Sequence, residues 1–304
     1  MNTIFMGTPD YATTILKALL RDESINIKAI FTQPDKPVGR KKILTPPHIK
    51  KFLLENGQKI PIYQPNSLKD EKVVKTIKNF NPDFIVVAAY GKILPKDILD
   101  IAPCINLHAS ILPKYRGASP IQQALLNGDE ISGVSAMLMD EGLDTGDILG
   151  FSIVKIEKED VAPTLFEKLS ILAGDLTLDV LKNFNKIKPI KQLNVDATYC
   201  KKIKKSDGEI EFLDAKEIFN RYRAFYFWPG IYLKSGLKLK EIDLVDEDSQ
   251  NEAGKIIEFK KSGIVVGCKK GKIEIKKVQP PSKKEMDIFS YLRGRRLKVG
   301  DYLS

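Results

Sequence analysis

The stretch Phe84-Ile85-Val86-Val87-Ala88-Ala89 decides the expected fold, because it is an uninterrupted apolar run of strand length. A run of this kind is typical of a central parallel strand that is buried on both faces. The amphipathic stretch Glu71–Asn79 precedes it as a predicted helix, and Cys104–Ala109 follows it as a further predicted strand.

The same alternation extends back to the N-terminus. Further strands are expected at Asn2–Met6, Ile25–Phe31 and Ile60–Tyr63. Helices are expected at Tyr11–Leu20 and Ile49–Asn56. This alternation predicts an α/β fold with a doubly wound, mostly parallel, Rossmann-like sheet and right-handed crossovers. Ligands in such folds bind beyond the carboxyl ends of the strands, so the loops that follow strands are the candidate sites.

The character of the chain changes near residue 184. A pair of antiparallel strands (Val134–Met139 and Gly150–Ile156) and a long helix (Val161–Phe184) are expected to complete a catalytic domain, 1–184. Residues 185–206 are basic and without periodicity, which predicts a linker. Residues 207–304 contain one expected helix, Ala215–Phe225, and about five short strands with glycine turns. This pattern predicts a small C-terminal β-barrel of the oligonucleotide-binding type.

The composition is that of a globular intracellular protein. The 304 residues are 43% hydrophobic and 29% charged, and no apolar run approaches the roughly 18 residues that span a bilayer. The N-terminus lacks the features of a secretory signal. The three cysteines have no CxxC spacing, which fits reduced thiols in the cytosol, and two histidines are too few for a multi-histidine metal site. We therefore expect a cytoplasmic protein with no membrane partner and no metal.

Positive charge is concentrated in the last third of the chain. Residues 201–304 carry 24 Lys+Arg against 16 Asp+Glu, whereas residues 1–200 carry 25 against 23. An excess of this kind fits a polyanionic partner such as nucleic acid, with Lys201–Lys205 and Lys269–Lys277 as candidate phosphate contacts. A solvated, lysine-rich surface also explains the charge, and charge alone favours this second explanation.

Asn106 and His108 form the first candidate for chemistry. Residues i and i+2 of a strand project to the same side, so both side chains face one way where the strand ends. An amide donor beside an imidazole can polarise a carbonyl and hold an oxyanion. Taken alone, such a pair is more often structural.

Asp144 lies in an acid-rich turn, Asp140–Asp147, that lacks the spacing of an EF-hand loop. Aspartates in such turns commonly cap backbone N–H groups. The alternative is that Asp144 reaches His108 from a neighbouring loop and stabilises the imidazolium form.

The motifs together resemble the folate-dependent formyltransferases. The resemblance is carried by Asn106-x-His108, Ser110-Ile111-Leu112-Pro113-Lys114-Tyr115-Arg116-Gly117 and Leu143-Asp144-Thr145-Gly146-Asp147-Ile148-Leu149. It extends from Met6-Gly7-Thr8-Pro9 to Gly294-Arg295-Arg296-Leu297, which is nearly the whole chain. It implies transfer of a formyl group from 10-formyltetrahydrofolate to the α-amino group of methionyl-initiator tRNA, by a monomer.

The resemblance also implies roles for individual residues. Asn106 and His108 would hold the formyl oxygen, while Asp144 would position His108 and relay protons. The expected tetrahydrofolate contacts are Ser110, Ile111, Leu112 and Pro113, with the backbone of the segment containing Tyr90, Gly91, Ile93 and Leu94 facing the pterin. Cys104 is expected to be structural, because this chemistry needs no covalent nucleophile.

The long basic segment Gln33–Lys42 is the expected determinant of the acceptor. Connections in α/β units usually have about 2–6 residues, and charge alone would make this one a mobile surface loop. The resemblance implies contacts with the tRNA acceptor end through Arg40, with Lys36, Lys41 and Lys42 beside it. Arginine can fork onto a phosphate, which lysine cannot.

Three alternatives remain open from the sequence. The acceptor could be glycinamide ribonucleotide, although the enzymes that use it are usually single-domain. It could be an amino-sugar nucleotide, although that reaction does not need the Arg40 segment. The chain could also be a nucleic-acid-binding protein with an inactive α/β half, which the intact Asn106, His108 and Asp144 set argues against. The aromatic stretch Tyr226–Gly230 is expected to be packed in the core or at a domain interface.

Overall fold

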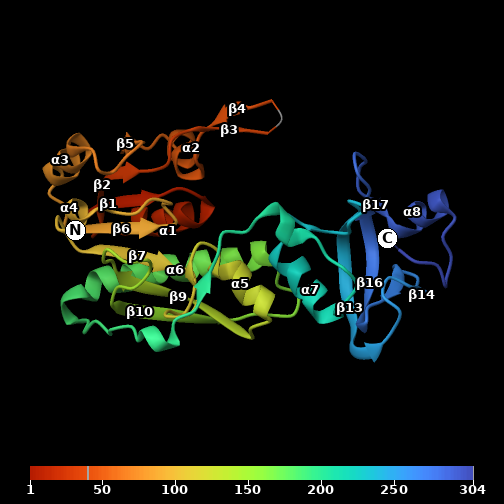
Figure 1. Ribbon diagram of the computed structural model, residues 1–304. Helices are drawn as coiled ribbons and strands as arrows, with labels where there is room; N and C mark the ends of the chain where they lie inside the picture. The colour runs from red at the N-terminus through yellow and green to blue at the C-terminus, as the bar shows by residue number, and fades with distance from the viewer. Residues whose placement is uncertain (40, 304) are drawn as a thin grey trace. The chain divides into compact units, whose positions relative to one another are not determined.

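A computed structural model describes residues 1–39 and 41–303, and the chain divides into two compact units (Figure 1). The first unit comprises residues 1–120, 131–155 and 166–200, and the second comprises residues 121–130, 156–165 and 201–304. Residues 185–200, which the sequence suggested as part of a linker, belong to the first unit.

A seven-stranded sheet forms the centre of the first unit. Its strands are β1 (Asn2–Gly7), β2 (Asn26–Phe31), β5 (Ile62–Tyr63), β6 (Phe84–Ala88), β7 (Cys104–His108), β9 (Ile131–Leu138) and β10 (Ile148–Lys155), in the order β10-β9-β7-β6-β1-β2-β5. The first five pair in parallel, and β9 and β10 add an antiparallel edge. The chain winds outward from β1 in both directions, which confirms the predicted doubly wound α/β fold.

The apolar run that decided the prediction is the centre of the core. Every residue of β6 is buried, as expected for a strand with helices on both sides of its sheet. The helices of this unit are α1 (Asp10–Leu20), α2 (His48–Glu55), α3 (Glu71–Asn79), α4 (Lys96–Leu99) and most of α6 (Ala162–Asn183). Helix α3 begins after Asp70, whose carboxylate accepts the N–H of Lys72 at 2.9 Å.

The basic segment after β2 is ordered as a hairpin. Strands β3 (Lys36–Val38) and β4 (Ile43–Thr45) pair antiparallel, and Figure 1 shows them projecting from the first unit. The segment that charge alone would make a mobile surface loop therefore contains paired strands, with Gly39 at φ +72° after β3. Arg40 lies outside the described residues.

The second unit is built on an antiparallel sheet, which confirms the predicted C-terminal β-domain. Its strands are β12 (Ile231–Tyr232), β13 (Lys238–Gln250), β14 (Ile256–Phe259), β15 (Ile264–Gly267), β16 (Lys270–Gln279) and β17 (Met286–Asp287). Its helices include most of α5 (Pro120–Asn127), α7 (Ala215–Ala224) and α8 (Ile288–Arg295). Neither β17 nor α8 was expected from the sequence.

Two features of the chain differ from what the sequence suggested. In the second unit, Tyr226, Phe227 and Trp228 are 39%, 80% and 55% exposed. Within Tyr226–Gly230, the stretch expected to be packed, only Pro229 is buried. Short 3₁₀ helices occupy Phe184–Lys186 and Asn194–Asp196 in the first unit and Lys205–Gly208 in the second, and they overlap the stretch 185–206 that was expected to be a linker without periodicity.

Candidate active site

The site begins where β7 ends. Asn106 and His108 are two residues apart on this strand, and β9 pairs with it so that Asn106 faces Met137 and His108 faces Ser135. His108 is buried, whereas Asn106 keeps partial exposure. The flanking strands therefore hold both side chains at the carboxyl edge of the sheet, where a ligand is expected in this fold.

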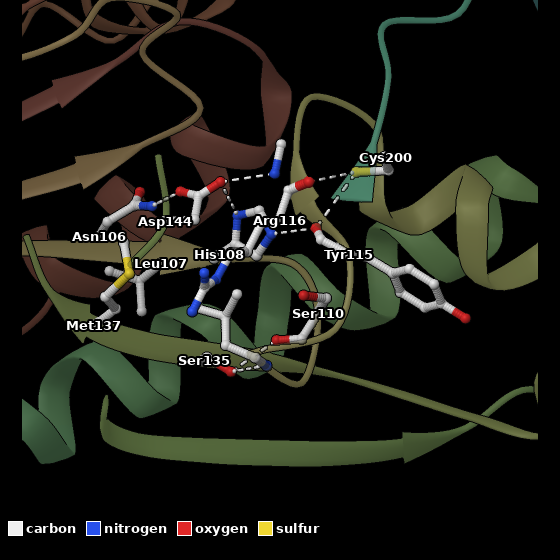
Figure 2. Close-up of polar contacts among 12 residues, drawn as sticks. Asn106, Leu107, His108, Ser110, Tyr115, Arg116, Ser135, Met137, Asp144 and Cys200 are labelled. Atoms are coloured by element: carbon white, nitrogen blue, oxygen red, sulfur yellow. Dashed lines mark hydrogen bonds and ion pairs between the residues drawn. The ribbon is translucent and has the colours of Figure 1, made fainter. Parts of the chain in front are cut away.

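Asp144 joins the pair from the loop between β9 and β10. Its Oδ1 accepts a hydrogen bond from Asn106 Nδ2 at 3.4 Å, and its Oδ2 lies 3.7 Å from His108 Nδ1 (Figure 2). The same Oδ2 accepts the backbone N–H of Gly117 at 2.8 Å. One carboxylate therefore contacts the amide, the imidazole and the loop that follows β7.

His108 has its second ring nitrogen fixed by the backbone. Its Nε2 lies 2.9 Å from the carbonyl oxygen of Tyr115, a residue with φ +59°. A carbonyl oxygen only accepts, so this contact requires the hydrogen to be on Nε2. The other nitrogen, Nδ1, then faces the Asp144 carboxylate.

This arrangement supplies oriented donors and a carboxylate, and it does not use a thiol. Cys104, on the same strand, is buried, and its Sγ donates toward the carbonyl of Ala102 at 3.4 Å. Burial raises the pKa of the Cys104 thiol to about 12, so the thiolate that nucleophilic catalysis requires is suppressed. The chemistry that fits is stabilisation of a negative charge on a carbonyl oxygen.

The four residues expected after β7 to contact folate form a compact loop. Ser110 is buried, and its hydroxyl donates to the carbonyl of Lys114 at 2.5 Å. Leu112 is also buried, and its N–H donates to Ser135 Oγ at 2.9 Å. Ile111 and Pro113 are partly exposed, and the Leu112–Pro113 peptide bond is cis. Their contact with folate stays a prediction.

The segment after β6 is held in place by hydrogen bonds that its backbone accepts from side chains elsewhere in the unit. The carbonyl of Tyr90 accepts hydrogen bonds from Thr8 Oγ1 and from Gln33 Nε2, both at 3.0 Å. The side chains of Tyr90 and Leu94 are buried in the core, whereas that of Ile93 is 81% exposed. Gly91, at φ +76°, makes the turn between them.

One set of site residues is not indicated by the sequence patterns. Residues 190–200, called the strap below, lie against the site at two places: β11 (Tyr199–Cys200) pairs in parallel with β8 (Arg116–Gly117), and Gln192 donates to the carbonyl of Asp144 at 3.0 Å. The strap has no hydrophobic period, which is why its sequence is typical of a linker. No local signal in the sequence would have revealed its contacts.

The basic residues expected to contact tRNA are exposed on the hairpin. Lys36 lies on β3, and Lys41 and Lys42 lie in the turn before β4. Exposed apolar side chains accompany them, including Ile43 and Leu44 at 62% and 66%. The hairpin therefore presents cations beside apolar surface.

Two kinds of feature are absent from residues 1–39 and 41–303. No helix in these ranges is both long and apolar enough to cross a membrane. In the same part of the chain, no three His, Cys, Asp or Glu side chains are grouped as metal ligands.

Comparison with known proteins gives matches over both units. Residues 1–181 match the family model described as formyl transferase, and residues 202–296 match that of the formyl transferase C-terminal domain. The chain is 64% identical over 301 residues to the methionyl-tRNA formyltransferase of Nitratiruptor sp., with 99% of each chain covered. It is 56% identical over 304 residues to that of Sulfurimonas denitrificans, with 100% of each covered.

A solved structure shares the fold at much lower identity. The structure of WlaRD, described as a sugar 3N-formyl transferase in the presence of dTDP and 5-N-formyl-THF, superimposes with a TM-score of 0.66. It is 20% identical, and the match covers 93% of this chain and 99% of that chain.

Proposed function

The chain belongs to the formyl transferase family, and we propose that within it this protein transfers the formyl group of 10-formyltetrahydrofolate to the α-amino group of methionyl-initiator tRNA, for translation initiation. The observation that carries the proposal is the contact of one partly buried carboxylate, Asp144, with both Asn106 and His108. The chain also matches methionyl-tRNA formyltransferases over nearly its full length.

The reaction needs charge stabilisation and a place for a proton. The amine nitrogen forms a bond to the formyl carbon, and the bond from that carbon to its donor nitrogen breaks. Negative charge develops on the formyl oxygen in between, so oriented hydrogen-bond donors lower the barrier. No bond to the protein is required.

The three central residues divide this work. Asn106 offers an amide N–H from the partly exposed edge of β7, and His108 offers its imidazole beside it. Asp144 holds both, since it is within 3.4 Å of the amide nitrogen and 3.7 Å of the ring nitrogen. It can also stabilise the proton that the attacking amine must lose, once that proton reaches His108 and before the departing donor nitrogen takes it up.

The loop after β6 and the loop after β7 fit the folate co-substrate. The Tyr90 and Leu94 side chains are buried, so this segment presents backbone groups and the exposed Ile93 to a ligand. The carbonyl of Tyr90 is tied to Thr8 and Gln33, which keeps that backbone rigid. Ile111 and Pro113 provide apolar contacts on the other loop.

The tRNA is expected to contact both units. The β3–β4 hairpin carries exposed lysines beside apolar surface. Arg40, which follows Gly39 in the sequence, would bind a phosphate through two hydrogen bonds. In the second unit, Lys272, Lys276 and Lys277 each face a carboxylate of β13 within 3.7 Å. The exposed run Lys201–Lys205 is therefore the stronger candidate for phosphate contacts than the lysines of β16.

A side-by-side assay of three acceptors tests the function. Purified protein and 10-formyltetrahydrofolate are offered charged initiator tRNA, glycinamide ribonucleotide or an amino-sugar nucleotide, and formylated product is measured. We expect transfer only to the tRNA. Transfer to either small molecule, without transfer to the tRNA, would refute the proposed acceptor. We further propose that the protein is cytoplasmic and monomeric. Sedimentation of the protein with and without tRNA would test whether it is a monomer.

A further inference from the structure

The strap ties together the two loops that complete the site. At the start of the strap, Ile190 exchanges two backbone hydrogen bonds of 2.8 and 2.9 Å with Ile148. Ile148 lies four residues after Asp144. Near its end, the carbonyl of Thr198 accepts the N–H of Arg116 at 2.9 Å. The strap therefore connects the loop that carries Asp144 to the loop that follows β7.

Gln192 makes the most direct contact with the Asp144 loop. Its Nε2 donates to the carbonyl oxygen of Asp144 at 3.0 Å and to that of Gly146 at 2.7 Å. The side chain is only 8% exposed. The two amide hydrogens thus hold the backbone on either side of Thr145, next to the carboxylate that contacts Asn106 and His108.

Arg116 fixes the orientation of that glutamine. Its Nε and Nη2 donate to Gln192 Oε1 at 3.2 and 2.8 Å. A guanidinium has donors only, so the glutamine oxygen must point to Arg116 and its NH₂ group must point to the loop. A third donor, Nη1, reaches Asn194 Oδ1 at 3.0 Å.

Burial of the Arg116–Gln192 pair has a free-energy cost that a purely structural contact does not explain. Arg116 is 1% exposed, and the hydrogen-bond acceptors of its side chain among the described residues are the uncharged groups of Gln192, Asn194 and Tyr199. Burial of a cation beside neutral acceptors is unfavourable compared with apolar packing. Asp144, in turn, has φ +54°, in the left-handed region that Asp tolerates better than most residues with a Cβ. Hydrogen bonds from Gln192 to the carbonyls of Asp144 and Gly146 stabilise this loop conformation.

We propose that Gln192, oriented by Arg116, is a positioning residue that sets the Asp144 carboxylate against Asn106 and His108. The strap, which leads into the second unit at residue 201, then also belongs to the catalytic apparatus. This inference rests on the proposed function for its kinetic readout. It has a second readout in the Gly117 N–H, which donates to Asp144 Oδ2 at 2.8 Å and so reports whether the carboxylate is in place.

The decisive variant is Gln192→Glu. Glutamate retains an acceptor for Arg116 and gains an ion pair with it, but it cannot donate to the two carbonyls of the loop. We expect kcat to fall by about tenfold to a hundredfold, because a small misplacement of a catalytic group has effects of this size. The KM values for folate and tRNA should stay near those of the wild type, and the Gly117 amide should exchange faster.

Three further variants separate positioning from folding and from charge. Gln58→Glu makes the same chemical change on an exposed residue of the same unit, and it should leave kcat and the Gly117 exchange rate unchanged. Gln192→Met removes the donors without adding charge, but it also removes the acceptor for Arg116, so the unfolding midpoint should fall. At a temperature where this variant is fully folded, it should reproduce the loss in kcat. In an Asp144→Asn background, Gln192→Glu should have little additional effect, because there is no carboxylate left to position.

The outcomes distinguish the two proposals. If the wild type transfers no formyl group to methionyl-tRNA, the proposed function fails, and Gly117 exchange in the Gln192 variants still decides the positioning role. Wild-type kcat and wild-type Gly117 exchange in folded Gln192→Glu would overturn that role. The positioning role would also be overturned if the loss of kcat in the double variant equalled the product of the losses in the two single variants. Failure of both Gln192 variants to fold would overturn it as well.

Discussion

The Nδ1 atom of His108 lies 3.7 Å from the Oδ2 atom of Asp144, although 35 residues separate the two in the chain. The same carboxylate also accepts from Asn106 Nδ2 and from the Gly117 N–H. Asp144 therefore needs both of its oxygens as acceptors. An asparagine at this position has one acceptor and would turn an N–H group toward a donor.

The first prediction follows from this need. Asp144→Asn should lower kcat by about a hundredfold or more, comparable to the loss of an oxyanion-hole donor, because the amide cannot satisfy Asn106, His108 and Gly117 together. Single-turnover formyl transfer measures the effect. Thr145→Ser, a conservative change in the adjacent position, is the control. An Asp144→Asn enzyme with full activity would show that Asp144 is only a turn residue.

The second prediction concerns the two site residues on β7. Asn106→Ala and His108→Ala should each reduce turnover by roughly a hundredfold or more, because the first removes an amide donor to the formyl oxygen and the second removes the imidazole that takes up the proton of the amine. Folate binding, measured by calorimetry, should persist, because its seat lies in the loops after β6 and β7. Near-normal turnover of His108→Ala would contradict the assignment.

The third prediction compares two sets of lysines in the second unit. Lys201, Lys202 and Lys204 are exposed, whereas Lys272, Lys276 and Lys277 face Asp246, Asp243 and Glu241, respectively. Changing either set to glutamine removes three positive charges. Only the first change should weaken tRNA binding strongly and flatten the salt dependence, by about one unit of slope for each phosphate that the variant no longer neutralises.

Dissociation constants for tRNA across a salt series provide this measurement. Equal effects of the two triple variants would mean that net charge, and not the position of the lysines, governs binding. No effect of either would identify the basic residues as a solvated surface.

The fourth prediction concerns Arg40. Arg40→Ala should reduce single-turnover transfer even when the enzyme is saturated with tRNA, because misplacement of the acceptor end lowers the rate beyond any loss of affinity. Arg40→Lys should restore tRNA affinity more than the transfer rate, because lysine provides the positive charge but not the two parallel hydrogen bonds of a guanidinium. If Arg40→Ala transfers at the wild-type rate under saturation, the hairpin serves only as an electrostatic tether.

The fifth prediction concerns alkaline stability. Burial raises the pKa of Cys104 from an ordinary value of 9.0 to about 12, so between these values the folded state holds a proton that the unfolded state has lost. The free energy of unfolding must therefore fall as pH rises through this range. In Cys104→Ala the decline should be shallower by up to about 1.4 kcal/mol per pH unit. Urea unfolding at pH 8 to about 10.5 measures the slopes, and identical slopes would contradict the assignment.

The sequence by itself determined the fold and the location of the candidate pair Asn106 and His108. The continuous apolar run of β6 and the amphipathic period of the neighbouring helices are both visible in a single sequence, so the doubly wound sheet could be predicted. The two-residue spacing of Asn106 and His108 on β7 likewise follows from strand geometry. The antiparallel C-terminal domain could be predicted from its glycine turns.

Only the tertiary structure decided which distant groups meet. The contacts of Asp144 depend on how the loop between β9 and β10 packs, and the contacts of Gln192 with that loop depend on a strap that has no period at all. The pairing of the β16 lysines with carboxylates of β13 depends on strand register. Local patterns record which face of an element is buried, but a contact between irregular segments is set by the packing of the whole unit, and no spacing along the chain encodes it.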